Sequence, residues 1–143
     1  MTAAPSPEPA AWWLRAALGD LAAARALVDL AGVPPRQAAY LAQQAAEKAL
    51  KATIALQGNE PPLRHDLLFL LDRSPGDARL RDIPVDLVAL SAAHTAARYP
   101  QVDDPPYDPD EVGQLVTDAS RLIVAVQEYF DRLGLAGTDL TPL

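Results

Sequence analysis

The 143-residue sequence contains no cysteine, a single methionine and only two histidines. Without cysteine, the chain forms no disulfides, no zinc–thiolate sites and no thiol nucleophile. No apolar run approaches the roughly 18 residues that a membrane-spanning helix needs. The first ten residues, MTAAPSPEPA, lack the basic and apolar regions of a signal peptide. These absences predict a cytoplasmic protein that does not contact membranes.

Positive charge is also scarce, with 12 Lys and Arg against 19 Asp and Glu and a formal net charge of −7. Broad binding to nucleic acid depends on many cationic contacts with phosphates, so only a local basic patch remains available for RNA. The sequence has no Gly-rich phosphate loop, no recognisable Ser-His-Asp set and no zinc-binding helix with paired histidines. The residues by themselves therefore indicate no metal site and no enzyme.

β-branched residues are few, because 9 Val and 3 Ile stand against 28 Ala and 22 Leu. Alanine and leucine favour helices, so the chain is predicted to be all-α. The 14 prolines interrupt this pattern, and helices are expected in the stretches between them. Asp108 and Pro109 supply an N-cap and a first-turn proline for the last of these. The predicted helices span residues 10–31, 36–57, 65–72, 84–97 and 109–133.

These helices are expected to form a single domain over residues 11–133. Residues 1–10 are predicted to be a mobile, proline-rich tail, and residues 134–143 a second tail without periodicity. The second helix is apolar around much of its circumference, which places it near the centre of the bundle. The apolar positions of the last helix alternate at steps of four and three. Such a seam packs against another helix or against its own copy in a dimer.

One segment, residues 38–71, carries a more specific pattern. Several polar residues occur in it at fixed spacing, and a short Leu-rich helix is predicted to follow them. Another matching tripeptide lies at the end of the predicted fourth helix. The matched elements are Gln43-Gln44, Glu47-Lys48-Ala49-Leu50-Lys51, Gly58, the proline turn at 61–62, His65-Asp66-Leu67 and Arg98-Tyr99-Pro100. Over roughly Trp12 to Leu133 the chain resembles the HEPN family, named for higher eukaryotes and prokaryotes and for nucleotide binding.

The resemblance implies an antiparallel four- or five-helix up-and-down bundle, frequently a homodimer. Many such proteins are encoded beside a minimal nucleotidyltransferase partner, and some of these pairs behave as toxin and antitoxin. The resemblance thus predicts a non-catalytic protein that binds a nucleotide of unidentified kind, or such a partner, and needs no other cofactor. One alternative is a protein-interaction adaptor without a small-molecule ligand.

Other family members are metal-independent ribonucleases whose site is an Arg, four to six intervening residues and a His, completed across the dimer. Neither His65 nor His94 has an Arg five to seven positions before it. His94 and Arg98 occur in the reverse order, which leaves a divergent ribonuclease with a composite site as a second alternative. Because the ribonuclease motif is absent, no catalytic residue is assigned.

The second predicted helix carries the only two lysines of the chain. Gln44, Lys48 and Lys51 are spaced to project from one helix face, where the ammonium groups suit phosphate oxygens. In the alternative interpretation this face is solvated, and Glu47 and Lys51 form an i, i+4 ion pair.

The remaining candidates lie at helix ends. A neutral His65 near a helix N-terminus could hydrogen-bond a nucleotide, although His65 or Asp66 could instead serve as a cap. His94 falls on an apolar stripe and is predicted to be a hydrogen-bonded core or interface histidine. Arg98 and Tyr99 offer a phosphate fork and an aromatic face, or Arg98 only stabilises a helix C-terminus. The predicted nucleotide-binding residues are Gln44, Lys48, Lys51, His65, Arg98 and Tyr99.

Overall fold

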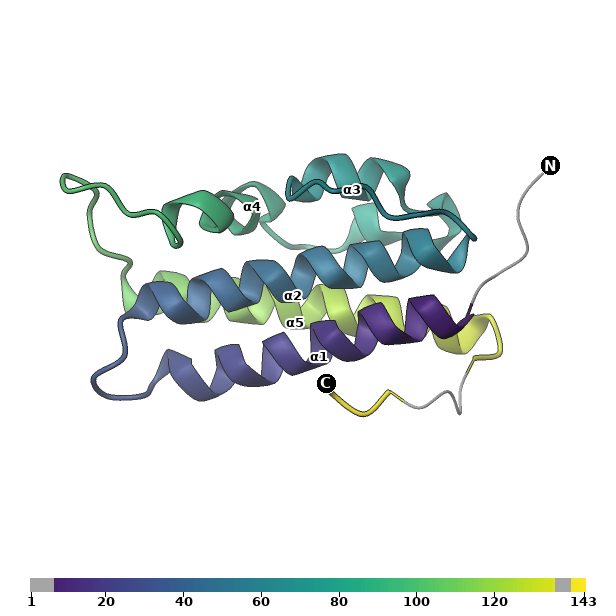
Figure 1. Ribbon diagram of the computed structural model, residues 1–143, viewed down its shortest axis with the longest axis horizontal. Helices are drawn as coiled ribbons and strands as arrows, with labels where there is room; N and C mark the ends of the chain where they lie inside the picture. The colour runs from purple at the N-terminus through teal and green to yellow at the C-terminus, as the bar shows by residue number, and fades with distance from the viewer. Residues whose placement is uncertain (1–6, 136–139) are drawn as a thin grey trace.

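The computed structural model describes residues 7–135 and 140–143, and within these residues the fold is all-α, without a strand. Figure 1 shows the long helices side by side and the shorter ones lying along one side of them. The elements are α1 (Pro7–Val28), α2 (Pro35–Leu56), α3 (Leu67–Arg73), two 3-10 turns (Gly76–Ala78 and Leu80–Asp82), α4 (Leu87–Ala96) and α5 (Pro109–Arg132). The prediction of an all-α fold is confirmed.

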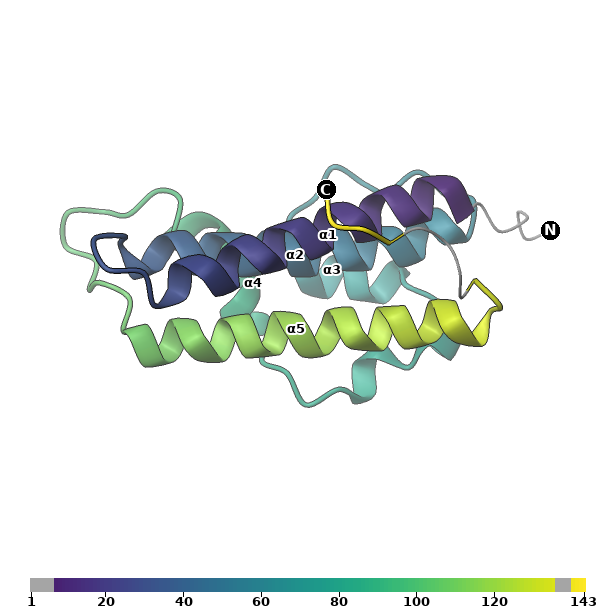
Figure 2. The same ribbon diagram turned by 90° about the horizontal axis from the view of Figure 1, so that it is seen from below.

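The direction of the chain alternates between α1, α2, α4 and α5, as Figures 1 and 2 show, which makes the fold an up-and-down bundle. Helix α2 packs against all four other helices and so lies at the centre, as predicted. Its many buried alanines present little bulk, and α1 packs along it extensively. The helix ends before Gly58, whose φ of 82° is a conformation that glycine adopts without strain.

Aspartate caps set three of the helix starts. Asp66 accepts hydrogen bonds from the backbone N–H groups of Leu68 and Phe69, and Asp108 accepts one from Asp110. The cap at Asp108 was expected, and of the two candidates that the sequence offered for α3, His65 and Asp66, the structure shows Asp66. The third, Asp86, makes α4 begin at Leu87 instead of Pro84. The sequence-based start of α3 was wrong by two residues, so that His65 stands in the loop before the helix.

The predicted boundary at residue 10 also needs correction, because α1 begins at Pro7 and residues 7–10 belong to the helix. Proline is tolerated in a first helical turn, where the missing N–H has no intrahelical partner. Residues 1–6 and 136–139 of the two predicted tails lie outside the described residues. At the end of the chain, Leu143 donates its N–H to the carbonyl of Arg15, so this part lies along α1. Among the described helices, none combines the length and apolarity that a membrane span requires.

Tyr129 on α5 gives the fold a specific dependence on alkaline pH. Its hydroxyl donates to Asp77 Oδ1 at 3.1 Å, and burial together with this carboxylate raises the pKa of Tyr129 to about 12. In the unfolded chain the tyrosine pKa is about 10. The stabilisation from this group is therefore complete below pH 10 and is lost as the pH rises toward 12.

We expect Tyr129→Phe to remove this part of the alkaline loss of stability, measured by urea unfolding at pH 9, 10 and 11. Tyr99→Phe is the matched control, because Tyr99 is exposed and its replacement should leave the wild-type decline intact. An equal decline in the wild-type protein and Tyr129→Phe would contradict the assignment.

Candidate functional site

The central helix carries a line of buried polar side chains. Gln43, Glu47 and Lys51 follow one another at four-residue steps on one face of α2, and each is at most 5% exposed. Lys51 Nζ lies 3.2 Å from Glu47 Oε2, and Gln43 Nε2 donates to Glu47 Oε1 at 3.3 Å. A buried charge is costly unless it is paired, and this ion pair satisfies both groups.

Both histidines of the chain lie beside these polar residues, His65 in direct contact and His94 stacked on His65. His65, in the loop before α3, places Nδ1 2.9 Å from Glu47 Oε1, and Gln43 Nε2 donates to the His65 carbonyl at 3.1 Å. His94, on α4, stacks on His65 with ring centroids 4.0 Å apart and planes 13° apart. We name Glu47, Lys51, His65 and His94 the histidine cluster. It joins α2, the loop and α4 at one point.

His94 is the unusual member of the histidine cluster. Its Nε2 is fully buried and has no hydrogen-bond partner among the described residues. Burial lowers the pKa of His94, and the neighbouring His65 acts in the same direction. His94 is therefore uncharged at neutral pH. The sequence predicted a hydrogen-bonded histidine here, whereas this nitrogen has no hydrogen bond to a described residue.

A second group continues from His94 toward the end of α4. The Arg98 guanidinium lies 6.0 Å from the Tyr40 ring centroid and 5.1 Å from that of Tyr99, and the Tyr40 and His94 rings are 6.2 Å apart. We name His65, His94, Tyr40, Arg98 and Tyr99 the aromatic row. Arg98 is exposed, and in the described part of the chain no carboxylate forms an ion pair with it.

The two lysines predicted to share a phosphate-binding face have different environments in the structure. Lys48 is half-buried and paired with Asp20 on α1, whereas Lys51 is buried against Glu47, with Nζ 5.5 Å from the Trp13 ring. Gln44 donates to Gln43 Oε1 at 2.7 Å. Each ammonium is thus held by its own carboxylate. The i, i+4 pair of Glu47 and Lys51 is present, but its face is buried and not solvated.

Of the predicted residues, the structure brings Lys51 into the histidine cluster, Arg98 and Tyr99 into the aromatic row, and His65 into both. Sequence reasoning missed the contribution of Tyr40 and treated Glu47 only as an ion-pair partner. A signal for both existed in the four-residue spacing of Tyr40, Gln44 and Lys48 and of Gln43, Glu47 and Lys51 in an alanine-rich helix.

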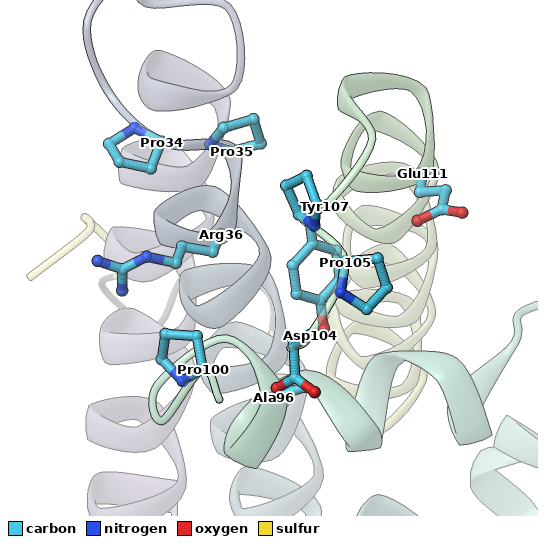
Figure 3. A pocket seen from close by; sticks show the side chains of 10 residues that line it. Pro34, Pro35, Arg36, Ala96, Pro100, Asp104, Pro105, Tyr107 and Glu111 are labelled. Atoms are coloured by element: carbon cyan, nitrogen blue, oxygen red, sulfur yellow. The ribbon is translucent and has the colours of Figure 1, made fainter. Parts of the chain in front are cut away.

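A cavity of about 520 Å³ lies beside the end of α4, within the range of small-molecule sites. Arg36 Nη1, on one wall, donates to the Ala97 carbonyl at 3.3 Å. Proline rings and Tyr107 surround most of the space (Figure 3), and two carboxylates at its edge disfavour anionic ligands. The lining residues are Pro34, Pro35, Arg36, Ala96, Pro100, Asp104, Pro105, Pro106, Tyr107 and Glu111.

Comparison with known proteins confirms the family resemblance. The HEPN domain family model matches residues 10–129. The crystal structure of TT1696 from Thermus thermophilus is similar, with a TM-score of 0.69 and 28% identity over 83% of this chain and 96% of that chain. The structure of ST0689, described as an archaeal HEPN homologue, has a TM-score of 0.63 and 28% identity over 84% of this chain and 96% of its own. A search among curated proteins finds no match to this chain.

Proposed function

This chain belongs to the HEPN domain family, and from that premise we propose that it binds a nucleotide, without chemical turnover, along the aromatic row. The phosphate contacts Arg98, and the base stacks on a tyrosine ring. Three of the residues predicted from the sequence, His65, Arg98 and Tyr99, keep the roles they were given there. Tyr40 and His94 join them.

The observation that carries this proposal is the environment of Arg98. Its guanidinium is exposed, has no carboxylate partner among the described residues and lies near two tyrosine rings. A guanidinium presents donors in a planar fork that matches phosphate oxygens, and an aromatic face suits a base. Lys48 and Lys51, in contrast, already have carboxylate partners, so a phosphate would have to displace these.

The adjoining imidazoles fit the same ligand. His94 is neutral at pH 7 because burial lowers its pKa, and its Nε2 has no partner in the described part of the chain. A buried polar atom of this kind gains most from a ligand that offers a hydrogen bond. We do not place the phosphate in the cavity beside α4, because the carboxylates of Asp104 and Glu111 line that cavity and repel an anion.

The experiment is calorimetric titration of the purified chain with ATP and with AMP, each with and without magnesium. We expect saturable binding that weakens about ten- to a hundredfold in Arg98→Ala, the range for a lost charged hydrogen bond. Arg81→Ala is the matched control, because it removes the same charge from an exposed pair with Asp72. Equal affinities for the wild-type protein and Arg98→Ala, or no saturable heat, would refute the proposed site and favour the adaptor hypothesis.

A further inference from the structure

The histidine cluster has a feature that nucleotide recognition does not require. The chain has only two histidines, and the fold places them ring against ring beside a buried carboxylate. Donor atoms of Glu47, His65 and His94 all lie within 4.8 Å of one another. Imidazole nitrogen and carboxylate oxygen are the donors that zinc and similar divalent transition metals bind in proteins.

Besides the close grouping of these donor atoms, the unpartnered Nε2 of His94 points to a missing ligand. This nitrogen is buried, and no described residue offers it a hydrogen bond. Buried polar atoms are nearly always satisfied, so an orphan of this kind calls for a group that the protein chain does not provide.

We propose that Glu47, His65 and His94 form a three-ligand site for a divalent transition-metal ion of the zinc type. Two histidines and one glutamate match a known class of zinc site that keeps a fourth position open. The site shares His65 and His94 with the aromatic row but uses neither the Arg98 guanidinium nor a tyrosine, so a change at Arg98 distinguishes the two proposals.

Metal binding requires a defined local movement. Bonds of about 2.0–2.1 Å in a tetrahedral site bring the donor atoms to about 3.3 Å from one another, so the present arrangement must contract. Parallel imidazoles cannot both direct a lone pair at one ion, and one ring must turn. His65 is able to do so, because its side chain is 52% exposed and lies in a loop. Glu47 and His94 are held by α2 and α4.

The surrounding groups orient the ligands and moderate the affinity. Lys51 holds the second oxygen of Glu47, and Gln43 holds the backbone of His65, so both ligands have fixed supports. The ammonium of Lys51, 3.2 Å from Glu47 Oε2, opposes a second cation at this point. We therefore expect micromolar and not nanomolar binding.

The test uses the untagged full chain, freed of metal by a chelator and titrated with Co²⁺ in the absence of nucleotide. We expect visible absorption bands of a low-symmetry cobalt site at one ion per chain, displaced by Zn²⁺. His65→Gln and His94→Gln should each weaken binding at least about tenfold. His65→Gln keeps the test informative if His94→Gln does not fold, because His65 is largely exposed.

Two controls isolate the site. Glu128→Gln removes an exposed carboxylate of α5 and should leave cobalt binding unchanged. Arg98→Ala should bind cobalt as well as or better than the wild-type protein even though its nucleotide binding is weakened, which separates the two proposals. The metal site is refuted by the absence of saturable binding below millimolar cobalt. It is equally refuted if either histidine variant binds cobalt as the wild-type protein does.

Discussion

Replacement of Glu47 by alanine is expected to destabilise the folded chain by about 3–5 kcal/mol, the usual cost of breaking a buried ion pair by removing one partner. The Glu47 carboxylate is only 5% exposed and contacts Lys51, Gln43 and His65. Its removal leaves the Lys51 ammonium, 6% exposed, without a counter-charge inside the bundle. Urea unfolding at pH 7, followed by helical circular dichroism, measures the change.

The double variant Glu47→Leu with Lys51→Met is the informative control. Removing both charges and filling the space with apolar groups is expected to be close to neutral or stabilising, because neither ion then has to be desolvated. Glu128→Gln should also have almost no effect, since that side chain is exposed. The interpretation is contradicted if Glu47→Ala matches the wild-type protein, or if the double variant is as unstable as Glu47→Ala.

Phe130→Ala is expected to cost about 3–5 kcal/mol, the range for deleting a buried aromatic ring and leaving a cavity. Phe130 is the largest of the fully buried side chains and is 1% exposed. It lies on the apolar seam of α5, the helix that closes the bundle against α1 and α2. Close packing prevents the neighbouring side chains from collapsing fully into the space.

The control for this variant lies on the same helix. Val124 is 47% exposed, so Val124→Ala should change the free energy of unfolding by no more than about 0.5 kcal/mol. Phe130→Leu should fall between the two, because it retains part of the buried volume. If Phe130→Ala and Val124→Ala have equal urea midpoints, the ring is not in the core as the structure places it.

The two predictions concern different kinds of buried group. A core ring contributes its apolar area directly to stability, whereas the pair of Glu47 and Lys51 contributes little beyond what an apolar pair would. The bonds from Glu47 to His65 and from Gln43 to the His65 carbonyl hold the loop before α3 against α2. We infer that the polar line on α2 serves to position His65, and the cobalt and nucleotide titrations both depend on that position.

The sequence by itself determined the helices and the family. Alanine and leucine content, proline positions and the caps at Asp66 and Asp108 act within a few residues of chain, so their effects are readable without knowledge of the fold. The starts of α1, α3 and α4 and the end of α1 at Val28 were missed by two or three residues, because proline and polar residues near a helix end allow several neighbouring positions for its bound.

Only the tertiary structure decided which polar groups meet. Whether Lys48 faces a ligand or Asp20 depends on how α1 lies on α2, and the spacing of residues within α2 contains no information about that contact. The stacking of His65 on His94 and the approach of Arg98 to Tyr40 likewise join segments far apart in the chain. Local propensity acts over one or two helical turns, but the position of a side chain in a site depends on packing between helices, which no single helix specifies.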